Sequence, residues 1–280
     1  MVGLTSSVND VLMREVACRL PSMEVAFFRV LFATLTLLPI VAIKGWETVY
    51  TKQINWHVLR AILGFTAITG WCFGLSHVPL AVVSTVGHTI PLFVLVLAFI
   101  LLKERVIWQR VAATLGGFMG IMIIVANTHD VTTGTHMHIW GILGLIIAAV
   151  CFALSDIVNK VMVHNESPLC MLFYFALGTT LAGAIPAFLV WTPPTMHELM
   201  YLLALGAGGN LILFFLLKAF AATDISALAP FRYVELIFAV LFGLFLYGEI
   251  PSNSVLIGIA IVVPSTFAAA IFENRRNTPA

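Results

Sequence analysis

Ionisable side chains lie inside several stretches of this sequence that are otherwise apolar. Arg232 and Glu235 are three residues apart near the centre of one stretch, so they share a face if the stretch is helical. Arg29 lies near the centre of another stretch, which Glu24 opens. Together, guanidinium and carboxylate groups in apolar surroundings can hold the charged groups of a small polar molecule, and arginine can bind a carboxylate with two parallel hydrogen bonds.

Two further acid–base pairs occur at one helical spacing. Asp10 precedes Arg14 by four residues, and Asp156 precedes Lys160 by four residues. Side chains four residues apart are neighbours on a helix, so each pair is either a ligand-binding group or an ion pair that holds helices together. The sequence leaves both interpretations open.

Polar and aromatic residues within the apolar stretches complete the set of candidates. Asn210 follows a run of small residues at 206–209, which allows two helices to approach closely and the amide to face a cavity. Aromatic and imidazole rings can stack on a planar or cationic ligand. Packing explains each of these residues equally well. The rings are Trp71, His88, Tyr174 and Tyr233.

The composition excludes most classes of protein. Of the 280 residues, 61% are hydrophobic and 10% are charged, and the mean hydropathy is +1.05. A soluble domain has about 25% charged residues, so a soluble enzyme, a nucleic-acid-binding protein and a disordered chain are excluded. The net charge of +1 provides no field for a polyanion. The 4 cysteines form no paired motif and are interpreted as packing residues.

The chain is predicted to be an all-α integral membrane protein with ten transmembrane helices. Each segment is a continuous apolar run, without the alternation of period two that is typical of a membrane barrel. The first segment is short, and we expect the complete first helix to begin further upstream. The segments are 1–18, 23–43, 56–77, 80–102, 106–126, 138–162, 169–191, 198–221, 225–247 and 253–272.

Basic residues orient these helices. Lys and Arg are enriched on the cytoplasmic side of membrane proteins. With a cytoplasmic N-terminus, ten of them are assigned to the inner loops and tail, and only Arg14 and Arg19 to the outer loops, so we expect both termini in the cytoplasm. The ten are Lys44, Lys52, Arg60, Lys103, Arg105, Arg110, Lys160, Lys218, Arg275 and Arg276.

The two halves of the sequence resemble each other. A shift of 146 residues places 9–14 (NDVLMR) on 155–160 (SDIVNK), and it also places 27–28 (FF) on 173–174 (FY). A chance likeness between apolar helices does not explain acid–base pairs that match at one offset. We therefore interpret the chain as an internal repeat.

Each half holds five segments, so the halves must insert with opposite orientations. The expected repeats are 1–127, with its short first helix, and 138–272. Pro91 and Pro230 interrupt the corresponding fourth and ninth segments. Inverted repeats with interrupted helices at matching positions are typical of alternating-access transporters, which bind their substrate where the repeats meet.

Motifs for other chemistry are missing from the sequence. There is no phosphate-binding loop, metalloprotease motif or nucleophile elbow. A histidine-rich stretch at 129–138 has a spacing that fits no standard metal-ligand set. We therefore expect a secondary transporter, not an enzyme, without a cofactor, catalytic residues or a metal.

The paired helix ends at Glu104 and Glu249, with ten segments in two inverted halves, resemble the drug/metabolite transporter superfamily of the type with two EamA domains. Three stretches, 6–29, 172–176 and 211–237, more closely resemble the S-adenosylmethionine uptake transporters of intracellular bacteria. The resemblance implies a multi-pass protein of the bacterial inner membrane that moves S-adenosylmethionine by alternating access. It also implies uptake, with exchange for S-adenosylhomocysteine as one mode.

This substrate carries a sulfonium, an ammonium, a carboxylate and an adenine ring. Carboxylates would meet its cations, arginine its carboxylate and a ring its adenine, but the same groups suit other zwitterionic metabolites. The alternative is an exporter of drugs, amino acids or other metabolites; an intramembrane enzyme or a channel is disfavoured. The oligomeric state stays open. The candidate substrate-binding residues are Asp10, Arg14, Glu24, Arg29, Trp71, His88, Asp156, Lys160, Tyr174, Asn210, Arg232, Tyr233 and Glu235.

Overall fold

The computed structural model describes residues 2–17, 20–77, 86–104, 107–127, 139–234 and 253–277, together with positions 238, 241 and 245. Within these residues all regular structure is helical, as predicted. The α-helices are α1 (Val2–Ala17), α2 (Ser22–Lys44), α3 (Ile54–His77), α5 (Ile90–Leu101), α6 (Trp108–Asn127), α7 (Ile139–Met162), α8 (Pro168–Leu189), α9 (Met196–Ala222), α10 (Ile225–Leu228) and α12 (Asn253–Asn277). Two 3₁₀ helices are η1 (Trp46–Val49) and η2 (Ala229–Val234).

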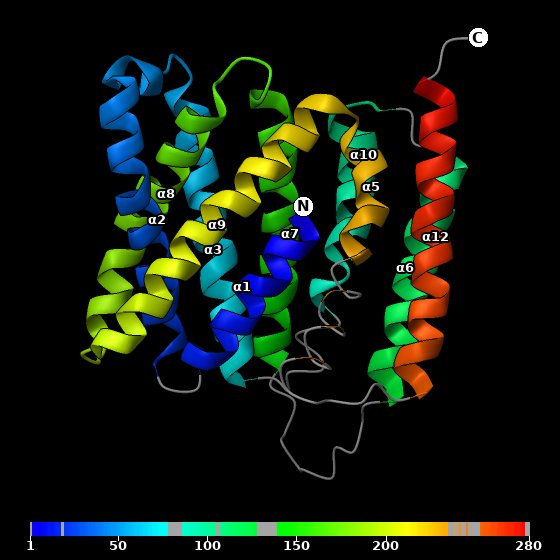
Figure 1. The fold of residues 1–280 in the computed structure, drawn as a ribbon, viewed down its shortest axis with the longest axis horizontal. Helices are drawn as coiled ribbons and strands as arrows, with labels where there is room; N and C mark the ends of the chain where they lie inside the picture. The colour runs from blue at the N-terminus through cyan, green and yellow to red at the C-terminus, as the bar shows by residue number, and fades with distance from the viewer. Residues whose placement is uncertain are drawn as a thin grey trace.

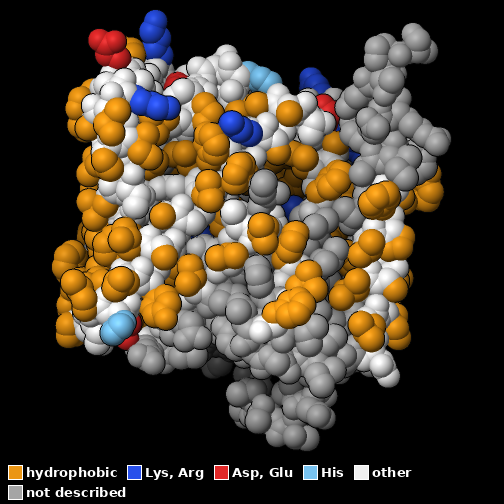
Figure 2. Space-filling model, viewed as in Figure 1, with side chains coloured by type: hydrophobic (Ala, Val, Ile, Leu, Met, Phe, Trp, Pro, Cys, Tyr) orange, Lys and Arg blue, Asp and Glu red, His pale blue; other side chains and the backbone are white. Residues whose placement is uncertain are grey.

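Four of these helices are long and apolar enough to cross a membrane, namely α2 from Met23, α7, α8 and α9. Their outward faces carry large apolar side chains, among them Ile185 and Leu189 of α8, which are 74% and 81% exposed. Figure 2 shows apolar side chains over much of the visible surface, whereas most of the visible Lys and Arg side chains gather toward its upper end. Such a surface requires an apolar solvent.

Both predicted proline interruptions coincide with helix ends. Helix α5 begins at Ile90 with Pro91 in its first turn, where a missing N–H costs no hydrogen bond. The predicted ninth segment, 225–247, is not one continuous helix in its described part, because α10 is followed directly by η2, which contains Pro230. Proline lacks the N–H that an α-helix needs at this point, and this accounts for the change.

The helices pack across the two halves of the chain. Helix α2 lies against α8 and α9, α3 against α7 and α8, α1 against α9, and α6 against α12 (Figure 1). Glycines allow the closest approaches. A Cβ on Gly206 would lie 2.6 Å from the backbone nitrogen of Ala33, and one on Gly70 would lie 2.7 Å from the carbonyl oxygen of Gly144.

Candidate functional site

An ion pair joins α7 to η2 inside the bundle. The carboxylate of Asp156 on α7 lies 2.9 Å from the guanidinium of Arg232 on η2. The Asp156 side chain is 9% exposed and that of Arg232 is 34% exposed. A buried carboxylate requires a partner of this kind. The side chain of Arg232 is therefore the more accessible member of the pair.

This pairing was not expected from the sequence, which predicted the partners from their spacing along a helix. There, Asp156 was grouped with Lys160 and Arg232 with Glu235. In the structure, Lys160 donates two hydrogen bonds of 2.6 Å to the carbonyl oxygens of Phe220 and Thr223, at the end of α9. Glu235 lies outside the described residues, as do the side chains of Asp10 and Arg14.

Arg60 is a second arginine near the same carboxylate. Its side chain lies on α3, is fully buried, and interacts electrostatically with Asp156. One guanidinium nitrogen, Nη1, donates to the carbonyl oxygen of Met171 at 3.0 Å, and the group lies 5.4 Å from the ring centroid of Phe175. Two other polar atoms, Nε and Nη2, have no hydrogen-bond partner.

Sequence analysis missed Arg60 because it counted this residue among the basic residues of the inner loops. The structure corrects that assignment, since Arg60 is in the second turn of α3 and has no exposed surface. A usable signal was present: Arg60 lies inside the predicted segment 56–77. Arg110, also counted with the loops, is 3% exposed on α6 and forms an ion pair of 3.1 Å with Asp224.

The segment that carries Arg232 is fixed by contacts at its beginning. Glu104 accepts hydrogen bonds from the backbone N–H groups of Ile225 and Ser226, at 3.0 and 3.1 Å, and from the Ser226 hydroxyl at 2.6 Å. Arg110 donates to the same hydroxyl at 2.6 Å. These charge-assisted contacts give Glu104 a structural role and hold α10 and η2 in place.

Tyr233 is buried and packs inside the bundle. Its ring lies so close to Gly117 that a Cβ there would have no room, and its hydroxyl donates to the carbonyl oxygen of His88 at 3.2 Å. Trp71 packs against Phe152 with a centroid separation of 6.3 Å. Tyr174 is half-buried, and its ring centroid lies 4.6 Å from that of His57. Tyr174 lies on α8 one turn after Met171, whose carbonyl oxygen accepts the hydrogen bond from Arg60.

Asn210, Glu24 and Arg29 have contacts in other parts of the bundle. Asn210 donates to the carbonyl oxygen of Ala33 at 2.7 Å and to the Thr36 hydroxyl at 3.0 Å, joining α9 to α2. Glu24 is fully buried at the beginning of α2, where Oε2 accepts from the backbone N–H of Thr192 at 3.0 Å and Oε1 has no partner.

Arg29 lies one helical turn beyond Glu24 on α2. Its side chain runs beside Gly209 of α9, where a Cβ would lie 3.6 Å from Nε. Figure 1 places the beginning of α2 at the lower end of the bundle and the last turns of α7, which carry Asp156, in the upper half. Glu24 is therefore at the opposite end from the Asp156–Arg232 pair.

The resulting arrangement is a carboxylate between two arginines, enclosed by α3, α7, α8 and η2. The two arginines differ in accessibility, because Arg60 has no exposed surface and the side chain of Arg232 is partly exposed. A zwitterion that reaches Arg232 can offer it a carboxylate and leave Asp156 for a cationic group. Such an exchange keeps every charge paired in a low-dielectric interior.

Comparison with known proteins gives one family. The model of the EamA-like transporter family matches residues 1–126 and 139–271. A protein of Rickettsia prowazekii, named S-adenosylmethionine uptake transporter, is 41% identical over 97% of this chain and 90% of its own length. A riboflavin transporter of Vibrio cholerae is 30% identical over 92% of this chain and 86% of its own length.

The fold is also found among solved structures. One crystal structure superimposes with a TM-score of 0.84 and covers 99% of this chain and 98% of its own chain. The sequence identity of that pair is 16%, so the likeness describes the arrangement of the helices and nothing of the substrate.

Proposed function

The chain belongs to the EamA-like transporter family, and on that premise we propose that it is a secondary transporter that takes up S-adenosylmethionine across a bacterial inner membrane. The single observation that carries the substrate is 41% identity, over 97% of the chain, with a protein named for that uptake. A relative at 30% identity is named a riboflavin transporter, so relatives of this chain are named for more than one metabolite.

The chemistry of the ion pair supports this substrate. The Arg232 guanidinium exchanges the Asp156 carboxylate for the carboxylate of the substrate. Asp156 then takes up the ammonium or the sulfonium, each of which needs a negative partner once water is removed. Tyr174, half-buried on the adjoining face of α8, offers a ring to the adenine.

Arg60 completes the proposed site as the group that holds Asp156 when Arg232 is occupied. Its unpartnered Nε and Nη2 atoms are donors within the same buried region, and its charge already acts on Asp156. Three other candidates are assigned supporting roles. Lys160 and Asn210 position α9, and Tyr233 positions η2, through the contacts described above.

We also propose that the protein consists of ten transmembrane helices in two inverted repeats, 1–127 and 138–272. Thr34 of α2 and Thr180 of α8 are 146 residues apart, the offset at which the two halves match, and their hydroxyl oxygens lie 3.2 Å apart. A residue that contacts its own counterpart lies on a two-fold axis. The packing of α3 on α7, and of α1 on α9, has the relationship expected across that axis.

The proposed orientation places both termini in the cytoplasm. Figure 1 shows the ends of α2, α9 and α12 and the beginnings of α3 and α8 at the upper end of the bundle. Lys44 and Lys52 belong to this end, by the positions of α2 and α3. By the enrichment of basic residues on the inner side, the upper end is cytoplasmic.

The membrane potential is a sufficient driving force. S-adenosylmethionine carries a net single positive charge at neutral pH. One such charge gains about 2.3 kcal/mol in crossing 100 mV, which supports roughly fifty-fold accumulation at about 1.4 kcal/mol per factor of ten. Uptake then needs no coupled ion. Exchange for neutral S-adenosylhomocysteine is driven in the same direction.

The deciding experiment is uptake of radiolabelled S-adenosylmethionine by proteoliposomes. We expect saturable uptake that rises when an inside-negative potential is imposed. Vesicles loaded with S-adenosylhomocysteine distinguish exchange, which they accelerate, from uniport, which they do not. Absence of uptake by protein that is helical and monodisperse would contradict the proposal. Efflux of another metabolite under the same conditions would instead favour the exporter.

A further inference from the structure

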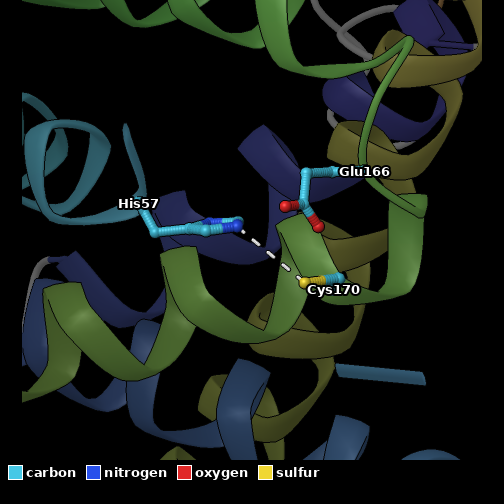
Figure 3. A group of neighbouring side chains, drawn as sticks. All are labelled: His57, Glu166 and Cys170. Atoms are coloured by element: carbon cyan, nitrogen blue, oxygen red, sulfur yellow. Dashed lines mark hydrogen bonds between the residues drawn. The ribbon is translucent and has the colours of Figure 1, made fainter. Parts of the chain in front are cut away.

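Three potential metal ligands meet at the upper end of the bundle, close to Arg60. They are His57 in the first turn of α3, Cys170 in the first turn of α8, and Glu166 in the turn that precedes α8. Their donor atoms all lie within 4.8 Å of one another. Figure 3 shows the three side chains directed toward a common point.

From this arrangement we propose that His57, Glu166 and Cys170 bind a zinc ion. Zn²⁺ takes thiolate, imidazole and carboxylate ligands, at about 2.3 Å for sulfur and about 2.0 Å for nitrogen. At a tetrahedral angle these bonds place sulfur and nitrogen about 3.5 Å apart. Cys170 Sγ and His57 Nε2 are 3.8 Å apart, so an ion fits between them with small adjustments.

The imidazole of His57 is poorly satisfied without an ion. Its side chain is 2% exposed, its Nδ1 has no partner, and its Nε2 contacts only the weak thiol group. A buried polar ring without a strong hydrogen bond is costly. Binding of Nε2 to a cation replaces the weak contact with a strong one. The Tyr174 ring packs against the imidazole at an interplanar angle of 34° and restricts its orientation.

Neighbouring groups orient the ligands and balance the charge. The Thr51 hydroxyl donates to Glu166 Oε1 at 2.5 Å, an outer contact of the kind that fixes metal-bound carboxylates. The guanidinium of Arg60 also interacts electrostatically with Cys170. One thiolate and one carboxylate neutralise Zn²⁺, and the thiol proton is released to solvent on binding.

The proposed zinc site was not predicted from the sequence. Cys170 was interpreted as a packing residue and no metal was expected, because the three ligands form no compact motif along the chain. Their convergence requires that α3 and α8 begin side by side, which they do. With three protein ligands the ion keeps a fourth position for water, and it links the beginnings of these two helices.

The test uses Co²⁺ as a spectroscopic substitute for Zn²⁺ on the full-length, tag-free protein in detergent, after treatment with a chelator. We expect one Co²⁺ per chain, a near-ultraviolet thiolate-to-cobalt charge-transfer band, and displacement of the band by Zn²⁺. The variant Cys170→Ser should lose the band. His57→Gln should bind at least about tenfold more weakly, the lower bound even for loss of an outer contact.

A matched control removes every other thiol. The triple variant Cys18→Ser/Cys72→Ser/Cys151→Ser keeps Cys170 as the one remaining cysteine of the chain. It should keep the band and the stoichiometry, and Zn²⁺ should raise its Tm but not that of Cys170→Ser. A band that survives in Cys170→Ser, or that is absent from folded wild-type protein, would overturn the proposal. None of these readouts depends on S-adenosylmethionine.

Discussion

The carboxylate of Asp156 and the guanidinium of Arg232 lie 2.9 Å apart, although one belongs to α7 and the other to the short 3₁₀ helix η2. The pair links α7, the first helix of the expected second repeat, to η2, which contains Pro230. Its two members differ in exposure, 9% for Asp156 and 34% for Arg232. We therefore expect a substrate to meet Arg232 before Asp156.

Removal of either charge should strongly reduce transport. Arg232→Ala leaves Asp156 buried near Arg60 alone, and Asp156→Asn leaves no acceptor for the substrate cation. In proteoliposomes we expect uptake of S-adenosylmethionine to fall at least about tenfold, since a lost hydrogen bond to a charged group costs about 1.5–3 kcal/mol. Lys218→Ala is the control, because Lys218 is exposed on α9 over the ring of Phe214. Wild-type uptake by Arg232→Ala would disprove the proposed site.

The carboxylate of the substrate should be recognised through arginine. Wild-type protein should bind decarboxylated S-adenosylmethionine at least about tenfold more weakly than S-adenosylmethionine, because one charge-assisted bidentate contact is lost. Arg232→Lys should reduce this discrimination, since an ammonium group cannot donate two parallel hydrogen bonds to one carboxylate. Competition binding with the radiolabelled substrate measures both ligands. Equal discrimination in wild type and variant would assign the carboxylate to another residue.

Arg60 should influence stability and substrate affinity together. Arg60→Met removes the hydrogen bond to the Met171 carbonyl and the charge beside Asp156. If Arg60 holds Asp156 during transport, uptake should fall in Arg60→Met and recover partly in Arg60→Lys. A purely structural residue would instead change Tm without changing the KM of the folded fraction. Thermal unfolding and initial rates on the same preparation separate the two results.

Lys160 should contribute to stability and not to substrate binding. Its ammonium donates to the carbonyl oxygens of Phe220 and Thr223, which α9 leaves without helical partners. Lys160→Met should lower the free energy of unfolding by about 1–3 kcal/mol, the range for hydrogen bonds from a charged group. The Kd for S-adenosylmethionine should stay within about twofold. A large loss of affinity in a folded variant would return Lys160 to the binding site.

Gly206 should be intolerant of any side chain. A Cβ at this position would lie 2.6 to 2.8 Å from backbone atoms of α2, so Gly206→Ala must separate α9 from α2. We expect a loss of about 1–3 kcal/mol, as for other overpacked sites. Gly183→Ala is the matched control, because the nearest atom to its Cβ would be a Phe27 ring carbon at 3.8 Å. The control should be neutral or stabilising, because alanine favours the helix. Thermal unfolding of both variants in the same detergent measures the two changes in stability, and an equal Tm for both variants would contradict the prediction.

The amino-acid sequence was sufficient to identify a membrane environment, the helical class and the charged residues that are candidates for the site. Long apolar runs can satisfy their backbone groups in lipid only as helices, so composition and segment length are sufficient. Arg232 and Asp156 were recognisable for the same reason, because a charge inside an apolar run is rare and requires a partner. The interruption at Pro230 also followed from local chemistry.

Which of the charged side chains contact one another followed from the packing of the helices and not from the sequence pattern. Spacing along a helix predicted Asp156 with Lys160, but Lys160 reaches the end of α9 and Asp156 reaches η2. Arg60 looked like a loop residue because its burial is created by α8, more than one hundred residues further along the chain. The spacing of residues along the sequence predicts only which side chains are neighbours on the same helix. Contacts between helices depend on their rotation and crossing, which small residues such as Gly206 set by allowing backbones to touch.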